Sequence, residues 1–420
     1  MKQTKHTLIT VFALIGMLFI FPPSHLRADE EKALTEALKK DLQDINNYSP
    51  FVEFLKLNPP QKNTWAYIEE KGKTRHDDWK KAAEAGIPEG QVLLGLYYYC
   101  QSGIGKPVGA VDADLAKEFH KKSVKLYRQA AEQGNADGQY HYAGWSHQDN
   151  GGQGGYKEYL QSASVWYRKA AEQGHARAQY ALADALYYTE YKGEVGLGWT
   201  EGTAVERAKW FLKAAEQGLA EAQEATGMMY GGWGNEVPRN PVKMAEWYLK
   251  AAEQGLPLAM VRVGLGYLEG REDSGFSLDY VKAAEWFQKA ADLDDSWGEH
   301  YLGVCYLEGK GVAKDVEKAL ELFRHATRDA TREGGLNFPG AHYRIAWCYA
   351  TGTGVEQDIE EALRWIREAE ERFSLLPSRN IIDGDKVAAL KKMIEEEQQA
   401  PWTHRIWNWL TGKNREIRVR

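Results

Sequence analysis

Hydrophobic positions along the chain follow two helical patterns that alternate and recur about every 40 residues. The first pattern carries a small residue, a Leu-Gly pair and a Tyr, as in the segment 296–306. In the second pattern, an aromatic and basic phrase precedes two alanines; Ala283, Trp286, Phe287 and Ala290 fall at i, i+3, i+4 and i+7 and so share one helical face. Each repeat is therefore predicted to be a pair of helices.

The second helix of a repeat ends in a recognisable motif, Ala-Ala-Glu-Gln-Gly. It occurs at Ala130–Gly134, Ala170–Gly174, Ala214–Gly218 and Ala251–Gly255, and weaker copies begin at Ala82, Ala290, Ala326 and Ala369. The closing glycine is suited to a helix C-terminus, where a left-handed backbone is easiest for glycine. A repeat of this length predicts a stack of supersecondary units, and such stacks present long grooves that hold other molecules.

The residues from Tyr301 to Ala319 resemble the signature of Sel1-like repeats, which are relatives of the tetratricopeptide repeats. The resemblance extends from about Asp78 to Arg372, in seven full units and the tail of an eighth. It implies an all-α, right-handed α-solenoid in which the first helix of each pair lines the concave side. Two glycine-rich insertions, Asp149–Gln161 and Tyr191–Thr203, depart from the pattern. Trp199, in the second insertion, and Trp233 lie in glycine-rich loops, where each ring either stacks on a ligand or packs against a neighbouring repeat.

The N-terminal segment, residues 1–28, is predicted to be a secretory signal peptide. Lys2 and Lys5 precede the apolar run Leu8–Phe21, and Pro22-Pro23 ends that run before a cleavage position ahead of Asp29. The run is shorter than the roughly 20 residues that span a bilayer. An exported protein, periplasmic or secreted, is therefore expected, with an uncleaved anchor as the alternative.

The rest of the chain divides into a helical cap over 29–77, the repeat solenoid over 78–374, a capping helix over 375–400 and a Trp-rich basic tail over 401–420. In the tail, Trp402, Ile406 and Trp409 fall on one helical face among basic residues. Such a segment either closes the apolar end of the solenoid or makes a peripheral contact with an anionic membrane.

Candidate binding positions come from comparing the first helices of the seven repeats. Positions on one side of these helices repeat from unit to unit, as packed positions do, whereas those two before, one after and five after the Leu-Gly glycine diversify. A diversified column is typical of a recognition surface, although exposed positions that vary freely would look the same. The candidates in these columns are His141, Asp184, Tyr188, Met228, Arg262, Tyr301, Arg344 and Trp347.

Sequence motifs of catalysis are missing. The chain has no His-Glu-x-x-His, no Gly-x-Ser-x-Gly and no Gly-x-x-x-x-Gly-Lys-Ser/Thr. Some cysteine-rich secreted members of the resembled family are linked to β-lactam binding and hydrolysis, but this chain lacks their paired cysteines. Its Cys305 and Cys348 occupy one helix position in successive repeats, either as a bridge or as two buried thiols, and the thiols are favoured.

Composition narrows the class of partner. The formal net charge is −7, and the first 28 residues carry three basic residues and no acid, so the remainder is more acidic still. Such a surface repels nucleic-acid phosphates. The prediction is a non-catalytic scaffold without cofactor or metal that binds a protein or peptide in its concave groove. A membrane-docked component of envelope or polysaccharide export is the alternative, with a β-lactam- or glycan-acting enzyme as the least favoured one.

Overall fold

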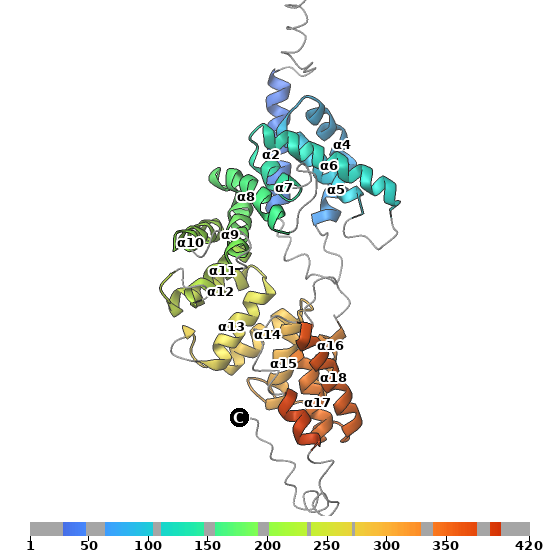
Figure 1. Cartoon of the computed structure of the whole chain (residues 1–420), viewed down its shortest axis with the longest axis vertical. Coiled ribbons are helices and arrows are strands. Elements are labelled where there is room, and N and C mark those ends of the chain that lie inside the picture. Colours follow the sequence, from blue (N-terminus) through green and yellow to red (C-terminus); the bar gives the residue numbers. More distant parts are fainter. Residues whose placement is uncertain are drawn as a thin grey trace, which may run out of the picture. The chain divides into compact units, whose positions relative to one another are not determined.

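The protein is all-α and divides into two compact units, which a computed structural model describes over residues 28–47, 64–103, 111–146, 156–191, 201–232, 237–270, 274–328, 339–375 and 387–395 (Figure 1). The described part of unit 1 holds α2 (Ala28–Asn47), α4 (Thr64–Glu84), α5 (Pro88–Gln101), α6 (Ala113–Glu132), α7 (Ala136–Ala143), α8 (Tyr156–Glu172), α9 (Ala176–Tyr191), α10 (Glu201–Glu216) and α11 (Ala220–Tyr230). That of unit 2 holds α12 (Pro241–Glu253), α13 (Pro257–Glu269), α14 (Tyr280–Ala291), α15 (Ser296–Glu308), α16 (Val316–Arg328), α17 (Pro339–Thr351), α18 (Ile359–Leu375) and a helix over 387–395.

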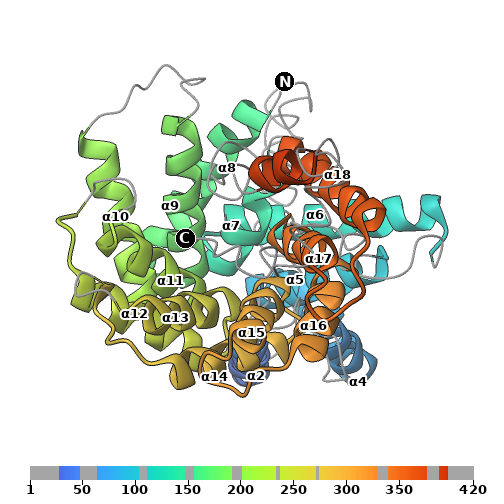
Figure 2. The same ribbon diagram turned by 90° about the horizontal axis from the view of Figure 1, so that it is seen from below.

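The predicted helix pairs are confirmed within each unit. In unit 2, α13 packs on α14, α15 on α16 and α17 on α18, and each of these pairs also contacts the next one along the chain (Figure 2). In unit 1 the same order runs through α5 and α6, α7 and α8, and α9 and α10. The described residues contain no strand. The chain is therefore an α-solenoid built from successive helix pairs.

Small residues of the first helix allow the second helix to approach closely. A Cβ added at Gly303 would lie 2.6 Å from the ring of Phe323, and one at Gly298 would lie 2.6 Å from the Cβ of Ala290. Both distances are shorter than real Cβ contacts, so the repeated small residues keep the interhelical spacing. The aromatic rings and alanines of the second helices then fill the core.

A tryptophan in each of several second helices is covered by the lysine three residues later. Lys169 Nζ lies 3.8 Å from the ring centroid of Trp166, Lys213 lies 4.6 Å from that of Trp210, Lys250 lies 4.0 Å from that of Trp247 and Lys289 lies 3.8 Å from that of Trp286. Residues three apart lie above one another on a helix, so each lysine reaches the ring of its own turn.

Glutamines join consecutive repeats of unit 1 through their side chains. The fourth residue of a first helix accepts a hydrogen bond from the glutamine that ends the second helix: Gln133 donates to Gln91 at 2.8 Å, Gln173 to Gln139 at 2.8 Å and Gln217 to Gln179 at 2.7 Å. The same fourth residue donates to an alanine carbonyl of the preceding repeat, as Gln179 does to Ala171. We call this set, Gln91, Gln133, Gln139, Gln173, Gln179, Gln217 and Gln223, the glutamine ladder.

In unit 2 the equivalent position is the apolar Met260 in α13, but it is an ionisable residue in α15 and in α17. In α15 it is Glu299, which is 4% exposed and pairs with Nδ1 of His325 on α16. In α17 it is His342, which is 1% exposed and whose Nε2 lies 3.9 Å from Oε2 of Glu368 on α18. In the first pair the first helix supplies the acid and the second helix the imidazole, whereas in the second pair the first helix supplies the imidazole and the second helix the acid.

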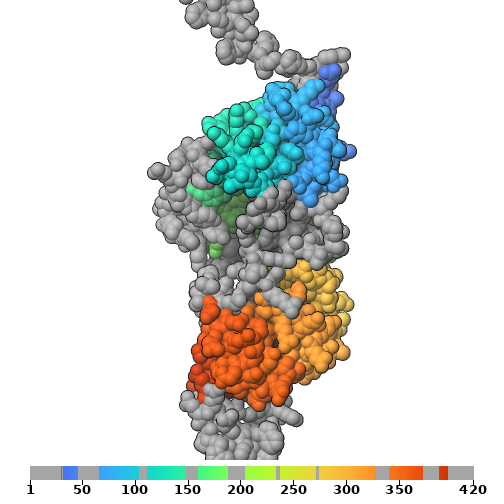
Figure 3. Space-filling view, turned by 90° about the vertical axis from the view of Figure 1, so that its right-hand side faces the viewer, coloured from blue at the N-terminus to red at the C-terminus, as the bar shows by residue number. Residues whose placement is uncertain are grey.

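The N-terminal helices of unit 1 pack on the first repeat, and α4, α5 and α6 form a continuous surface (Figure 3). Leu38, Ile68 and Trp79 are fully buried there. The buried carboxylate of Asp41 accepts hydrogen bonds from Trp79 Nε1 at 3.2 Å and Arg75 Nε at 3.1 Å. A charge removed from water is tolerated when it is paired in this way.

Several predictions fall on residues outside the described ranges. These are the signal peptide apart from its last residue, the tail 401–420, Trp199 and Trp233. Within the described ranges, no helix has the length and apolar character needed to cross a membrane. Cys305 and Cys348 are buried free thiols, and burial raises the pKa of Cys305 to about 11 and that of Cys348 to about 12, so neither is a reactive thiolate at neutral pH.

Candidate functional site

Two first helices of unit 1, α7 and α9, begin at residues whose side chains cap the helix. Asn135 caps α7 by accepting from the Gly138 amide at 2.8 Å, and Nδ1 of His175 caps α9 by accepting from the Ala178 amide at 3.0 Å. Because Nδ1 accepts, the His175 proton resides on Nε2, which lies 3.4 Å from Asp137 Oδ1. The two helices therefore start in register.

A hollow of about 340 Å³ opens among α7, α8, α9 and α11 of unit 1. Its lining combines four phenols, three charged groups and four apolar side chains. They are Tyr140, Tyr159, Tyr167, Tyr180, Arg177, Asp184, Glu221, Leu160, Ala181, Ala185 and Leu219. We call this the tyrosine hollow. Apolar walls with a few placed polar groups are the usual make-up of a binding site.

The rings of the tyrosine hollow are held by other rings. Tyr140 stacks on the imidazole of His175 with centroids 4.8 Å apart, and it lies 5.9 Å from the ring of Tyr167. Tyr180 packs against Phe211, with centroids 5.5 Å apart. Rings fixed in this way lose little further conformational entropy when a ligand binds.

Burial shifts the pKa values of several groups in the hollow. Burial raises the pKa of Tyr140, and burial with the neighbouring Tyr159 raises that of Tyr167, so both stay neutral phenols that donate and accept hydrogen bonds. The pKa of Asp184 is raised above its ordinary value, because the effect of burial is larger than that of the nearby positive charge of the fully buried Arg207, which acts in the opposite direction. Among the described residues that line the hollow there is no histidine, cysteine or serine that could act as a nucleophile or base.

A row of alternating charges follows the hollow from helix to helix. Asp137, Arg177 and Glu221 occupy the second position of α7, α9 and α11, and each lies partly exposed. A segment with charges of alternating sign would be matched along this row, in addition to an apolar side chain inserted among the rings.

Within unit 1, the structure brings one predicted site residue, Asp184, into the hollow. His141 instead stacks on Tyr127 at 5.1 Å, and burial lowers its pKa to about 4. Met228 packs against the apolar core formed by α8 to α11. The side chain of Tyr188 lies outside the described residues.

In unit 2, the predicted site residues spread over three first helices. Arg262 is exposed on α13. Tyr301 of α15 stacks on Phe287 with centroids 5.2 Å apart. On α17, Arg344 Nη1 lies 3.9 Å from Oε1 of Glu308, while Trp347 packs against the core. The structure thus joins Arg344 to a residue of the neighbouring repeat.

The predicted columns contain buried members, because a first helix is covered on more than one side. Leu93, at the position two before the Leu-Gly glycine, is fully buried, and Val304, one after it, is 7% exposed. The missed tyrosines, Tyr140 and Tyr180, both lie three before the reference position. That column also diversifies, with Val92, Glu224, Val261, His300 and Tyr343 at the other repeats, and this was the signal that could have identified it.

The repeats match a known protein family. The family model described as Sel1 repeat matches residues 88–135, 136–175, 208–219, 220–256, 257–295, 298–328 and 339–372, more than half of the chain. A search of curated proteins found no significant match.

Solved structures resemble the chain as well. A Sel1 repeat protein from Oxalobacter formigenes is 28% identical, over 60% of this chain and 94% of that chain, with a TM-score of 0.47. The c5321 protein, a protective antigen present in uropathogenic Escherichia coli strains that displays an SLR fold, is 21% identical over 86% of this chain and 94% of that chain, with a TM-score of 0.37. Sel1 repeats generally mediate protein–protein interactions and typically form non-catalytic scaffolds. From the matched repeats and the helix pairs that they form, the chain belongs to the Sel1 repeat family.

Proposed function

We propose that the protein is an exported, non-catalytic scaffold that recognises a peptide or loop of another protein in the tyrosine hollow. The observation that carries the proposal is the set of four tyrosines beside Arg177, Asp184 and Glu221 in one hollow of about 340 Å³. Tyrosine and arginine are the residue types found most often at energetic centres of protein interfaces. The hollow has the size for one anchoring side chain and its neighbours, which suits a short segment better than a flat protein surface.

The chemistry of the expected ligand follows from the lining. An aliphatic or aromatic side chain would fill the space among the phenols, since their neutral state keeps the walls apolar at the ring faces. Next to it, an acidic residue would face Arg177, and basic residues would face Glu221 and Asp137. Neutral phenols and apolar walls make up most of the described lining, and this composition supports binding of a peptide side chain.

A peptide library displayed on phage and selected on the chain 29–420 tests this function. Selected peptides should carry an apolar anchor flanked by opposite charges, and calorimetry should show an affinity that falls at least about tenfold in Arg177→Glu and Tyr180→Ala, because interface anchors are worth about 1–2 kcal/mol or more. The matched control is Lys125→Glu, a charge reversal at an exposed position of α6. Equal affinity for Arg177→Glu and wild type would contradict the assignment of the hollow.

Export is supported by the pattern of the N-terminal residues, Lys2 and Lys5 before the apolar run Leu8–Phe21. Fractionation of expressing bacteria, followed by N-terminal sequencing, tests it. A mature chain that starts at or near Asp29 and leaves the cytoplasm is the expected result, and an intact Met1 in the cytoplasmic fraction would contradict it.

A second proposal concerns the tail 401–420, whose Trp402, Ile406 and Trp409 share a helical face beside basic residues. It predicts association with anionic liposomes that weakens with salt and is lost on deletion of 401–420. This assay is independent of the peptide experiment, so either proposal can fail alone.

A further inference from the structure

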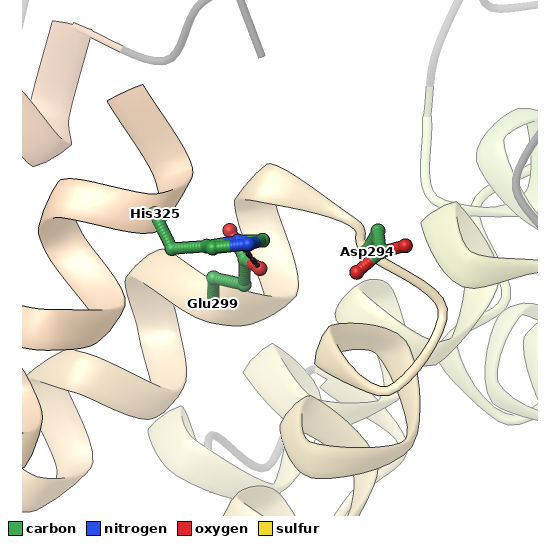
Figure 4. Close-up of side chains that lie close together, drawn as sticks. All are labelled: Asp294, Glu299 and His325. Carbon is green, nitrogen blue, oxygen red and sulfur yellow. Dashed lines mark hydrogen bonds and ion pairs between the residues drawn. The ribbon is translucent and has the colours of Figure 1, made fainter. Parts of the chain in front are cut away.

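Three side chains that ligate metal ions meet in unit 2, where the turn between α14 and α15 faces α16. Asp294, Glu299 and His325 each offer one ligand atom, and these atoms lie within 4.8 Å of one another (Figure 4). Asp294 comes from the turn, Glu299 from the first turn of α15 and His325 from α16. Small rotations of the side chains would bring the three atoms to the bond lengths of about 2.0–2.2 Å that zinc has with nitrogen and oxygen.

Each of the three residues departs from the residue that the other repeats carry at its position. Asp294 occupies the place of Gly134, Gly174, Gly218 and Gly255, and it forms the same turn: its amide donates to Ala291 as that of Gly134 donates to Ala131. Among the described residues it is the one non-glycine residue with a positive φ, at 56°. A side chain is therefore present where the backbone favours none.

The departures at the other two positions also introduce ligands. Glu299 stands where unit 1 has Gln91, Gln139, Gln179 and Gln223 of the glutamine ladder. His325 stands where other second helices have Lys169, Lys213, Lys250 and Lys289. In those other repeats these three positions hold a glycine, a glutamine and a lysine with different structural roles. In this repeat they hold two carboxylates and an imidazole that lie close together.

Charge and hydrogen bonding favour a cation between these groups. The α14–α15 turn holds three aspartates; Asp292 accepts from Gln288 Nε2 at 2.8 Å, and Asp295 caps α15 by accepting from the Gly298 amide at 2.7 Å. The carboxylate of Asp294 makes no hydrogen bond or ion pair among the described residues. It adds a second negative charge close to the buried carboxylate of Glu299, and two neighbouring carboxylates attract a cation between them.

We propose that Asp294, Glu299 and His325 form a site for a divalent transition-metal ion such as Zn²⁺. One imidazole and two carboxylates suit zinc and its neighbours rather than Mg²⁺, which prefers oxygen ligands alone. Three protein ligands leave a coordination position for water or for a donor from outside the chain. The ion would fasten the end of one repeat to the second helix of the next, so it would stabilise unit 2. This inference does not depend on the proposed peptide ligand of unit 1.

The test uses the untagged full chain after removal of metal by chelator and dialysis. Titration with Zn²⁺ against a chromophoric competitor should show one saturable site with micromolar affinity, and Zn²⁺ should raise the temperature of thermal unfolding. Asp294→Gly, Glu299→Gln and His325→Lys each install the residue that other repeats use, so these variants are expected to fold, as circular dichroism would verify. Each should weaken Zn²⁺ at this site at least about tenfold and abolish the thermal shift.

The next repeat supplies the matched control. His342 and Glu368 form the same kind of imidazole–carboxylate pair, so His342→Gln should leave the affinity for Zn²⁺ unchanged. The proposal would be overturned if the wild type showed no saturable binding at Zn²⁺ concentrations up to about 100 μM, well above a micromolar dissociation constant. Equal affinity of the wild type, Asp294→Gly and His325→Lys for Zn²⁺ would overturn it as well. Binding of Mg²⁺ in preference to Zn²⁺ would overturn the assignment of the ion class.

Discussion

The two units place different chemistry at one structural position, the fourth residue of the first helix. In unit 1 this residue is a glutamine whose neutral amide both accepts from its own repeat and donates to the preceding one, as Gln179 does. In unit 2 it is Met260 in α13 and an ionisable residue in the two first helices that follow, Glu299 and His342, each of which faces a residue of opposite charge type on the second helix. A neutral amide meets both requirements without burying charge, whereas an ionisable residue needs a specific partner. The repeat backbone therefore tolerates either solution, but the two solutions are not interchangeable one residue at a time.

Placing an acid of the unit 2 type at the glutamine position of unit 1 should lower the free energy of unfolding more than any other change considered. Gln179→Glu would bury a carboxylate against the Ala171 carbonyl oxygen, to which Gln179 now donates, so two acceptors would face each other. We expect a loss of about 3 kcal/mol in the free energy of unfolding at neutral pH, measured by urea denaturation. The reverse exchange, Glu299→Gln, replaces the buried carboxylate by a neutral amide that can still form hydrogen bonds, and it should cost about 1 kcal/mol. Equal costs for the two exchanges would break the comparison.

Unit 1 contains an ionisable residue of its own, His141, and this sharpens the comparison. Burial lowers its pKa to about 4, below the ordinary value of 6.5, so the unfolded chain takes up the proton first as the pH falls. The stability contributed by neutral His141 is complete above pH 6.5 and is lost as the pH falls towards 4.

Between pH 7 and about pH 4.5, the wild type should therefore lose up to about 2 kcal/mol more than His141→Gln, which cannot titrate in this range. Urea unfolding of both proteins at the two pH values measures the difference. Parallel losses in the two proteins would show that His141 takes its proton as readily when folded as when unfolded.

Removing one donor of the glutamine ladder should have the smallest effect. Gln217→Ala leaves the buried Oε1 of Gln179 without the amide that now donates to it at 2.7 Å, and about 1 kcal/mol of unfolding free energy should be lost. Glu216→Ala, an exposed neighbour, serves as the control and should change stability by less than about 0.5 kcal/mol. A ladder that matters to unit 1 predicts a clear difference between these two variants.

The helix pairs could be predicted from the sequence because their signals are local. The alanine and aromatic positions of α14, such as Ala283 and Phe287, repeat with helical spacing and are fully buried in the structure. The closing glycines, such as Gly174 with a φ of 95°, also occupy the left-handed conformation that their position predicted. Periodicity and turn chemistry are read within a few residues of the chain, so the sequence alone suffices for them.

The candidate site was predicted less well, because it depends on contacts between helices. Asp184 lies at a variable position of a first helix and does line the tyrosine hollow, but Tyr159 and Tyr167 reach the hollow from α8, a second helix, where the variable columns of the first helices cannot indicate them. His141 also lies at a variable position and is instead stacked on Tyr127. A helical wheel assigns one packed side, whereas the first helix of a stacked repeat has neighbours on several sides.

The lysines that lie over the tryptophans of the second helices have a consequence for how such a chain can grow. In each of four second helices an exposed lysine covers the indole three residues before it, as Lys289 covers Trp286. A duplicated repeat would thus add a wetted face rather than one more segment of an adhesive apolar stripe. The number of repeats can change by duplication or loss without making the protein progressively less soluble, so length is free to follow the dimensions of whatever the scaffold must hold.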